Sequence, residues 1–475
     1  MSVLAPARAA ALTALMEAGE QDRYVRDVLD GSARVAALDA RDAGFARRLA
    51  LGVTAARGCL DELLDRCLDR PRRVSPRVRM ALRISTFELL YLGTAPNIAV
   101  SQGVELVRSV AKGAAGLANA VLRRVAAEAG GYLAAADLDS AAGVGRTVRA
   151  ARGAGLPSWL VSDLAKSLEG RAAGPDALAG LLACELEPAP SAAHVNACRA
   201  GEDLPAIGDG GAGAGIPGCI EAADVAALAA SGALDRADAV VSDRNAQLVA
   251  TAATGPGSCL EIGAGRGTKT FVMGCQALRA GYERVHVAVD LSVGKLAANA
   301  ARLERAGMRA VRFAAGDARE LDGVLAAWDA EHGRRGLFDI VFLDAPCSGT
   351  GTMRRHPEIP WRLAPQDVHE TLPALQLALL QQAAGRVGLG GELLYATCSV
   401  LASENECVVD AFLASDAGKG FAVAPVRSAG VFSQPGFEGA GALAARHQTE
   451  RGFFQTTPRP AGYDGHFCAR LLRMG

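Results

Sequence analysis

Residues 258–270 read S-C-L-E-I-G-A-G-R-G-T-K-T, and this stretch decides the fold of the second half of the chain. Its first five residues read as a short strand with apolar residues at 259, 260 and 262, and glycines follow at positions 263, 265 and 267. Glycines so spaced let the backbone approach a ligand closely and turn a buried strand into the helix behind it. The pattern alone is shared by several classes of nucleotide-binding enzyme. It therefore predicts a strand, loop and helix that open a ligand-binding sheet.

Four further apolar runs follow this loop, at residues 284–290, 310–314, 338–344 and 392–397. Helical stretches separate them, of which 292–306 is the clearest. Alternation of this kind predicts a doubly wound, parallel α/β sheet. Ligands of such sheets bind beyond the carboxyl ends of the strands. We therefore expect the chemistry of this protein at that edge.

Helical patterns fill the chain up to about residue 130. Within residues 77–92, apolar and small residues fall near one face of a predicted helix: Val78, Ala81, Leu82, Ser85, Leu89 and Leu92. Between Arg47 and Arg83 stand ten arginines and four acidic residues. This local positive excess suits contacts with phosphates, and equally suits an ordinary solvated helix surface.

We expect three domains. Residues 1–130 form an all-α domain, 131–235 a small α+β connecting subdomain, and 236–475 a Rossmann-like (class I) α/β domain. The run G-D-G-G-A-G-A-G-I-P-G at 208–218 is typical of a flexible loop. The Gly-rich and polar stretch 430–465 is expected to be a mobile loop over the site.

Composition limits the class of protein. The formal net charge is −1, so any nucleic-acid surface must be local. The eleven cysteines lack C-x-x-C spacing, which favours a reduced, cytoplasmic protein without a structural metal. The sequence contains no uninterrupted run of about 18 apolar residues, so we expect no membrane span. We expect a monomer.

Acids at the ends of two predicted strands complete a cofactor site. Asp290 ends the second strand, where a carboxylate can hold ribose hydroxyls, and Asp317 follows the third, where it can accept from an adenine amino group. Each aspartate taken singly could be a helix N-cap. Lys269 lacks the spacing of a phosphate-binding Walker motif. S-adenosylmethionine therefore fits better than ATP, while NAD remains open from this loop alone.

Two thiols and a carboxylate follow the next two strands. F-L-D-A-P-C-S-G-T-G at 342–351 brings Asp344 and Cys347, and A-T-C-S at 396–399 brings Cys398. Thiols beside a methyl donor suggest covalent catalysis. A thiolate that adds to carbon 6 of cytosine makes carbon 5 nucleophilic enough to accept a methyl group, and Asp344 could bond N3 and the exocyclic amine of the ring. The residues alone leave open which thiol attacks.

These motifs resemble those of the RsmB (Fmu, or Sun) family of bacterial 16S ribosomal RNA cytosine-5 methyltransferases. The similar segments are L-D-A-P-C-S-G-T-G-T-M-R-R-H-P-E-I-P-W, L-L-Y-A-T-C-S-V-L-A-S-E-N-E, D-R-N-A-Q-L-V-A and G-D-A-R. A-L-R-I-S-T-F-E-L-L-Y-L and L-A-N-A-V-L-R-R-V resemble the NusB-like RNA-binding domain of the same proteins. The resemblance covers nearly the whole chain and implies small-subunit ribosomal RNA as the partner.

The resemblance also implies roles for single residues. Cys398 would be the nucleophile, and Cys347 would assist release of the methylated RNA. DNA cytosine methyltransferases attack with the Pro-Cys thiol instead, so Cys398 favours the RNA type. Lys269 would point toward the reacting centre. The residues that would bind S-adenosylmethionine are Gly263, Ala264, Gly265, Arg266, Gly267, Thr268, Lys269, Asp290, Asp317 and Asp344.

One departure from the family motivates an alternative function. The family has C-A-A-P-G-G-K where this chain has G-A-G-R-G-T-K at 263–269. The altered loop restores the general glycine pattern of methyltransferases, so we expect cofactor binding to be retained. The alternative is a non-catalytic RNA-binding or ribosome assembly factor whose methyltransferase domain has degenerated.

Overall fold

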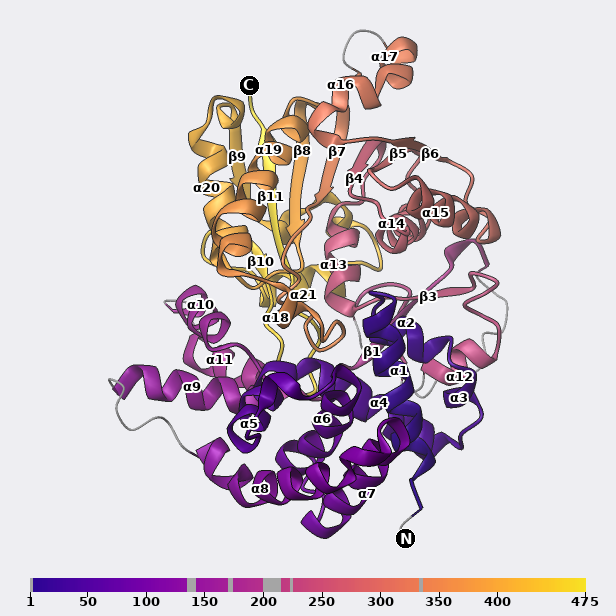
Figure 1. Ribbon diagram of the computed structural model, residues 1–475. Helices are drawn as coiled ribbons and strands as arrows, with labels where there is room; N and C mark the ends of the chain where they lie inside the picture. Colours follow the sequence, from indigo (N-terminus) through magenta and orange to yellow (C-terminus); the bar gives the residue numbers. More distant parts are fainter. Residues whose placement is uncertain (1–2, 135–141, 170–173, 200–214, 223–224, 333–335) are drawn as a thin grey trace. The chain divides into compact units, whose positions relative to one another are not determined.

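The computed structural model divides the chain into two compact units (Figure 1). The first contains residues 1–188 and 353–364, and the second contains 189–352 and 365–475. The junction at 188 falls inside the predicted connecting subdomain, and the boundaries at 130 and 235 stay predictions. The structure describes the whole chain except residues 1–2, 135–141, 170–173, 200–214, 223–224 and 333–335.

The first unit is helical. Its helices before residue 188 are α1 (Pro6–Glu20), α2 (Val25–Asp30), α3 (Ala33–Ala36), α4 (Ala40–Ala55), α5 (Arg57–Cys67), α6 (Pro76–Tyr91), α7 (Pro96–Val110), α8 (Ala115–Ala134), α9 (Ala142–Ala154), α10 (Ser158–Leu168) and α11 (Gly174–Cys184). Among the described helices of the chain, none is both long and apolar enough to cross a membrane.

Helix α6 lies at the centre of this unit. It begins at Ser75, whose hydroxyl accepts a hydrogen bond from the Val78 amide, and Pro76 occupies its first turn. The predicted helix is confirmed, but its one-sided apolar face is not, because residues 81–88 are buried all round. Helices α1, α4, α5, α7 and α8 pack against it. Arg83 is buried there and forms a two-pronged ion pair with Asp61 at 2.8 and 2.7 Å.

Residues 353–364 belong to the helical unit although they follow the Cys347 motif in sequence. They contain the short helix α18 (Ile359–Arg362). The Trp361 indole nitrogen donates to the Ala55 carbonyl at 2.5 Å, and Glu358 accepts from the Val25 amide at 2.8 Å. A Cβ atom at Gly58 would lie 2.0 Å from the indole ring. Only glycine at position 58 lets this segment dock on α5.

The second unit is built on a twisted sheet of eight strands (Figure 1). Seven run in the order β10-β11-β8-β7-β4-β5-β6, and β9 pairs with β11. Their bounds are β4 (Gly257–Ile262), β5 (Arg284–Asp290), β6 (Val311–Ala315), β7 (Phe338–Asp344), β8 (Val387–Thr397), β9 (Phe421–Ala424), β10 (Phe454–Gln455) and β11 (Phe467–Arg473). The five predicted strands are confirmed as a parallel core, whereas β9, β10 and β11 run antiparallel to their neighbours.

Helices cover both faces of this sheet. On one face, α13 (Arg244–Ala252) and α14 (Thr268–Arg279) pack against Phe342 and Leu394. On the other, α19 (Leu372–Ala384) and α20 (Glu406–Ala414) pack against Val341 and Tyr395. Neighbouring residues of one strand thus face opposite layers, as a doubly wound sheet requires. The remaining helices of this layer system are α15 (Val293–Arg305), α16 (Leu321–Val324) and α17 (Ala326–His332).

A small sheet comes before the large sheet in the chain. It joins β1 (Ser191–Val195), β2 (Cys219–Ala222) and β3 (Ala239–Val241) in the order β2-β1-β3, and the short helix α12 (Val225–Ala230) lies between β2 and β3 in sequence. The predicted loop 208–218 lies mostly outside the described residues. The loop predicted for 430–465 is wrong, because this stretch contains α21 (Glu438–Arg446) and β10. Phe432, Phe437 and Leu443 fix it by packing into the core.

Candidate active site

The carboxyl ends of five adjacent strands bring together the predicted site residues. Strand β4 leads into the glycine loop, β5 ends at Asp290, and β6 is followed by Asp317. Strand β7 ends at Asp344, and Cys398 follows β8 directly. Because β7 lies between β4 and β8, the glycine loop, the Asp344 loop and the Cys398 loop meet at the centre of this edge.

The glycine loop forms an open cradle. Gly263, Gly265 and Gly267 have φ angles of 82°, 55° and 82°. A Cβ at Gly263 would lie 2.3 Å from the Asp344 carbonyl oxygen, and one at Gly267 would lie 1.9 Å from the Asn299 side chain. At Gly265 the nearest atom would be 3.9 Å away, so a side chain there would occupy the cradle itself. The altered loop therefore keeps room for a ligand against its backbone.

The other loop residues contribute mainly through their backbone. Ala264 is buried against Ala288 and Leu296. Arg302 donates to the Arg266 carbonyl at 2.6 Å and to the Thr268 hydroxyl at 3.4 Å, which ties the loop to α15. The loop is thus held in one shape before any ligand enters.

Asp290 is aligned by the loop that it faces. Its carboxylate accepts from the amides of Gly265 and Ser292, both at 2.8 Å. Each carboxylate oxygen retains a lone pair that can accept a ribose hydroxyl. This side chain therefore serves as a local cap and also fits a ribose.

Asp317 is held differently. It accepts from the Arg319 amide at 2.9 Å and forms an ion pair with the Arg319 guanidinium. These hydrogen bonds lower the pKa of Asp317 to about 2, so the carboxylate is an acceptor at neutral pH. An adenine amino group would share this carboxylate with Arg319. Asp317 lies at the strand end, as predicted, and it also caps the helical turn Ala318–Glu320 that follows.

Lys269 and Asp344 form an ion pair of 2.6 Å in the partly open centre of the site. Their side chains keep 18% and 27% exposure, so a substrate can reach them. Burial opposes the charge of Lys269, but Asp344 outweighs it and raises the lysine pKa. Burial raises the pKa of Asp344, and the lysine offsets only part of this effect. A carboxyl whose pKa is raised holds a proton more readily than an ordinary carboxyl does.

Cys347 and Cys398 face each other with 3.4 Å between their sulfur atoms. Their hydrogen bond lowers the pKa of Cys398, and this effect together with the Lys269 charge outweighs burial. The same hydrogen bond, with burial, raises the pKa of Cys347 well above its ordinary value. The pair thus favours a thiolate on Cys398 and a proton on Cys347. The thiolate is the nucleophilic form of cysteine.

A buried carboxylate that sequence reasoning missed joins the loops of the two thiols. Glu404 is fully buried and accepts from the Ser348 amide at 2.8 Å, the Ser348 hydroxyl at 2.5 Å and the Ser399 hydroxyl at 2.6 Å. Gln376 donates to it at 3.0 Å. Ser348 and Ser399 each follow a site cysteine directly in the chain. We call this group the Glu404 clamp, and no spacing in the sequence indicates it, since only the fold brings the two serines together.

Comparison with known proteins agrees with this geometry. Residues 252–472 match the model of the 16S rRNA methyltransferase RsmB/F family, and residues 5–127 match the NusB family. Rv1407 of Mycobacterium tuberculosis, named as a candidate methyltransferase, is 32% identical over 83% of this chain and 84% of its own length. Ribosomal RNA small subunit methyltransferase B of Escherichia coli (strain 536) is 28% identical over 91% of each chain.

A solved structure shows the same fold. The crystal structure of PH0851 superposes with a TM-score of 0.67 over 99% of both chains, at 19% identity. The NusB match confirms the predicted helical domain type, and the family match confirms the predicted methyltransferase domain. The chain is a ribosomal RNA methyltransferase that uses S-adenosylmethionine, and it belongs to the RsmB/F family of 16S rRNA methyltransferases.

Proposed function

We propose that the protein methylates carbon 5 of a cytidine in 16S ribosomal RNA through a covalent bond between Cys398 and carbon 6 of the base. The observation that carries this proposal is the thiol pair, 3.4 Å apart, with its proton biased onto Cys347. Carbon 5 of cytosine is too electron-poor to take a methyl group directly. A thiolate beside a carboxyl of raised pKa is the arrangement that activates it.

The first step is addition to the base. The Cys398 thiolate forms a bond to carbon 6, and the displaced electron pair moves through the ring toward N3. In the proposed reaction, Asp344 donates a proton or hydrogen bond to N3 and accepts one from the exocyclic amine, and its ion pair with Lys269 holds the carboxyl in place. S-adenosylmethionine, when bound at the glycine loop, supplies an electrophilic methyl group for carbon 5.

The last step releases the RNA. The proton on carbon 5 leaves to a base, its electron pair forms the double bond between carbons 5 and 6, and the Cys398 sulfur departs with the electrons of the carbon–sulfur bond. The hydrogen bond to Cys398 is the largest cause of the raised pKa of Cys347. Because that bond is lost when the Cys398 sulfur is alkylated, Cys347 then releases its own proton to solvent more readily, and the thiolate that remains can take the carbon 5 proton.

Incubation with radiolabelled S-adenosylmethionine and unmodified 16S rRNA, followed by nucleoside analysis, tests the function. We expect label in 5-methylcytidine alone. Label in another nucleoside would exclude the reaction. A failure to bind S-adenosylmethionine by calorimetry would favour the alternative of a non-catalytic assembly factor, against which the open glycine cradle stands.

The Glu404 clamp is expected to position both thiols. In Glu404→Gln, the side chain keeps one acceptor oxygen instead of two, so it cannot accept from both the Ser348 amide and the two serine hydroxyls. We expect a fall of about 100-fold in the single-turnover rate, since a displacement of about 1 Å has that effect. Quenched-flow measurement of labelled RNA gives this rate.

The control is Asp416→Asn, which alters an exposed carboxylate that pairs with Lys419. The clamp variant should keep its affinity for S-adenosylmethionine, because Glu404 does not touch the glycine loop. Loss of activity in proportion to loss of folded protein would show that Glu404 only stabilises the unit.

A further inference from the structure

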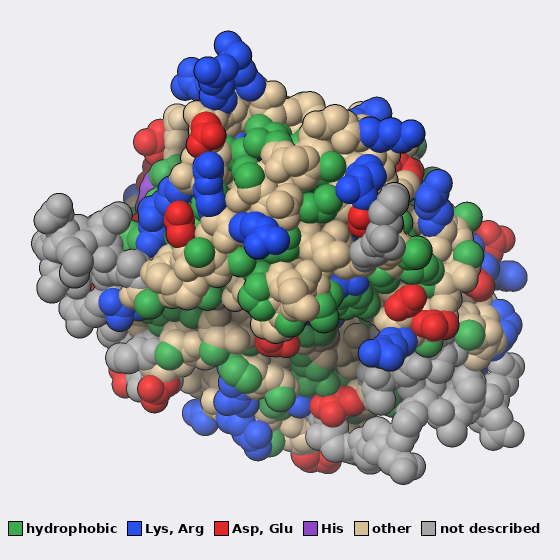
Figure 2. Space-filling model, turned by 60° about the horizontal axis from the view of Figure 1, so that its bottom comes forward, with side chains coloured by type: hydrophobic (Ala, Val, Ile, Leu, Met, Phe, Trp, Pro, Cys, Tyr) green, Lys and Arg blue, Asp and Glu red, His purple; other side chains and the backbone are tan. Residues whose placement is uncertain are grey.

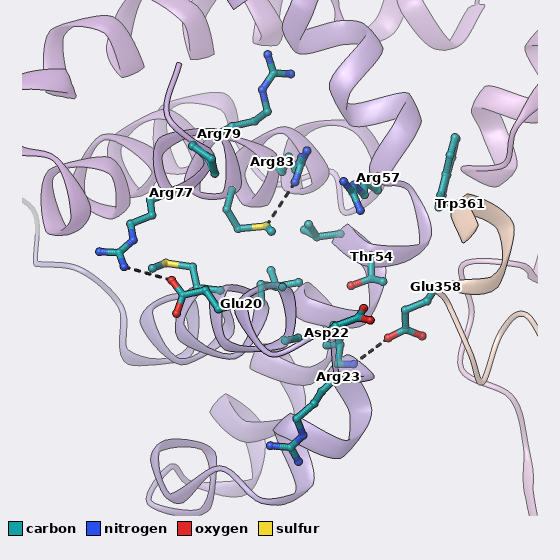
Figure 3. Close-up of a pocket in the computed structure, with 18 of the residues that line it drawn as sticks. Glu20, Asp22, Arg23, Thr54, Arg57, Arg77, Arg79, Arg83, Glu358 and Trp361 are labelled. Carbon is teal, nitrogen blue, oxygen red and sulfur yellow. Dashed lines mark hydrogen bonds and ion pairs between the residues drawn. The ribbon is translucent and has the colours of Figure 1, made fainter. Parts of the chain in front are cut away.

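The helical unit contains an arginine-lined pocket of about 730 Å³ (Figure 3). Its walls come from α1, α2, α4, the first residue of α5, residues 71–74, α6 and residues 353–364. The volume lies within the range of about 300–1,000 Å³ that is common for sites of small organic ligands. The pocket can therefore admit a nucleotide-sized group.

Charge compensation is incomplete in this pocket. Seven arginines and three acidic residues line it. Five of the arginines have an acidic partner: Arg23, Arg77, Arg79, Arg83 and Arg362. Arg57 and Arg72 have none among the described residues, and both are exposed. Two guanidinium groups are thus left for an anion.

Figure 2 shows one face of the molecule, on which basic side chains are interspersed with acidic and apolar ones and do not form one continuous patch. The formal net charge of −1 agrees with that distribution. With no net positive charge on the chain to attract RNA from a distance, we expect contact with RNA to depend on local groups of arginines without acidic partners.

Aromatic and hydroxyl groups lie beside Arg57. Figure 3 shows Arg57 and Thr54 on the side of the pocket that Trp361 borders. Trp361 is held by Gly58 and the Ala55 carbonyl, so its ring is fixed in place. A fixed indole next to guanidinium groups is the combination that binds single-stranded nucleic acid, through stacking on a base and pairing with phosphates.

We propose that this pocket binds a single-stranded segment of the substrate RNA, with its phosphates on Arg57 and Arg72 and one base against Trp361. The proposal rests on the proposed function and adds a second point of RNA contact to it. An acidic protein segment would match the two arginines but would leave the indole without a stacking partner. Trp361 also belongs to residues 353–364, which follow the Cys347 loop in the chain. RNA bound in the pocket would therefore contact the segment that comes directly after that loop in sequence.

The test compares Arg57→Gln/Arg72→Gln in the full chain with Arg34→Gln/Arg123→Gln, which changes two exposed arginines of the same unit that do not line the pocket. Filter binding of unmodified 16S rRNA is measured without cofactor across a salt series. We expect affinity to fall about tenfold in the pocket variant and the slope of log K against log salt to become less negative by about 1.4, because two phosphate contacts are lost. Unchanged affinity and slope would overturn the proposal.

Two further measurements separate the alternatives. A polyglutamate peptide that competes as well as a polyuridylate of equal charge would point to an acidic protein partner and overturn the RNA assignment. Bound polyuridylate should quench tryptophan fluorescence in the wild type and much less in Trp361→Phe; equal quenching in both would exclude the stacked base. Because these measurements need no methyl transfer, absence of 5-methylcytidine from the wild-type reaction would refute the proposed function without altering their outcome.

Discussion

Replacing Cys398 with alanine is expected to abolish formation of 5-methylcytidine, with a fall in rate of roughly six orders of magnitude, the size of effect that removal of an attacking nucleophile can have. The loss of activity is expected because Cys398, and not Cys347, provides the thiolate that attacks the base. Cys398 is the member of the pair whose pKa is lowered, by the Cys347 hydrogen bond and by Lys269. Cys347 holds its proton more tightly and cannot replace it at neutral pH.

The matched control is Cys407→Ala, which removes an exposed thiol of the same unit that lies outside the site. It should methylate RNA at the wild-type rate. Label transfer is measured as radioactivity in 5-methylcytidine. Wild-type transfer by Cys398→Ala would contradict the assignment, and transfer that is lost only in Cys347→Ala would move the attacking role to Cys347.

The pH profile should follow the same thiol. Because the pKa of Cys398 is below the ordinary thiol value, the single-turnover rate should rise with pH through a midpoint below that value. A Cys347→Ala substitution removes the largest cause of the lowered pKa, so its adduct formation should need a higher pH.

Replacing Cys347 with alanine is expected to trap the protein on its RNA. At the higher pH that this variant needs, addition by Cys398 and methyl transfer should proceed, whereas the base that takes the carbon 5 proton is missing. A complex that survives denaturing electrophoresis should then accumulate with unmodified 16S rRNA and S-adenosylmethionine. We expect multiple turnover to fall by about 100-fold, within the range for loss of a general base.

Cys347→Ala/Cys398→Ala is the control for this experiment, because it cannot form the bond to carbon 6 and should give no stable complex. Rapid turnover by Cys347→Ala without a trapped species would exclude the release role. A trapped species in the double variant would show that another residue attacks the base.

Strand positions in the methyltransferase unit could be predicted closely from the sequence. Strands β5 and β7 begin and end at the predicted residues. Buried parallel strands are continuous apolar runs, and the polar residue at each end marks the boundary. For the same reason, the sequence alone allows Asp290 and Asp344 to be placed at one edge of the sheet.

Other features depended on tertiary contacts that no local pattern encodes. Helix α6 has an amphipathic sequence, yet other helices surround it. Its polar side can be buried because neighbouring helices supply acidic partners for its arginines, such as Asp61 for Arg83. Six of the ten arginines between positions 47 and 83 are paired with acids, several of them distant in sequence. The sequence therefore overstated the free charge of this region. The Glu404 clamp escaped prediction for the same reason.

The path of the chain through residues 353–364 has a consequence for exchanging parts between relatives. A cut at residue 188 does not yield two self-sufficient modules, because the helical one would lack Trp361 and Glu358, and the other would carry them without their partners. A chimera that replaces residues 1–188 must therefore also replace 353–364. We expect the effects of substitutions at position 58 and at Trp361 to depend on each other, although about three hundred residues of chain separate the two positions.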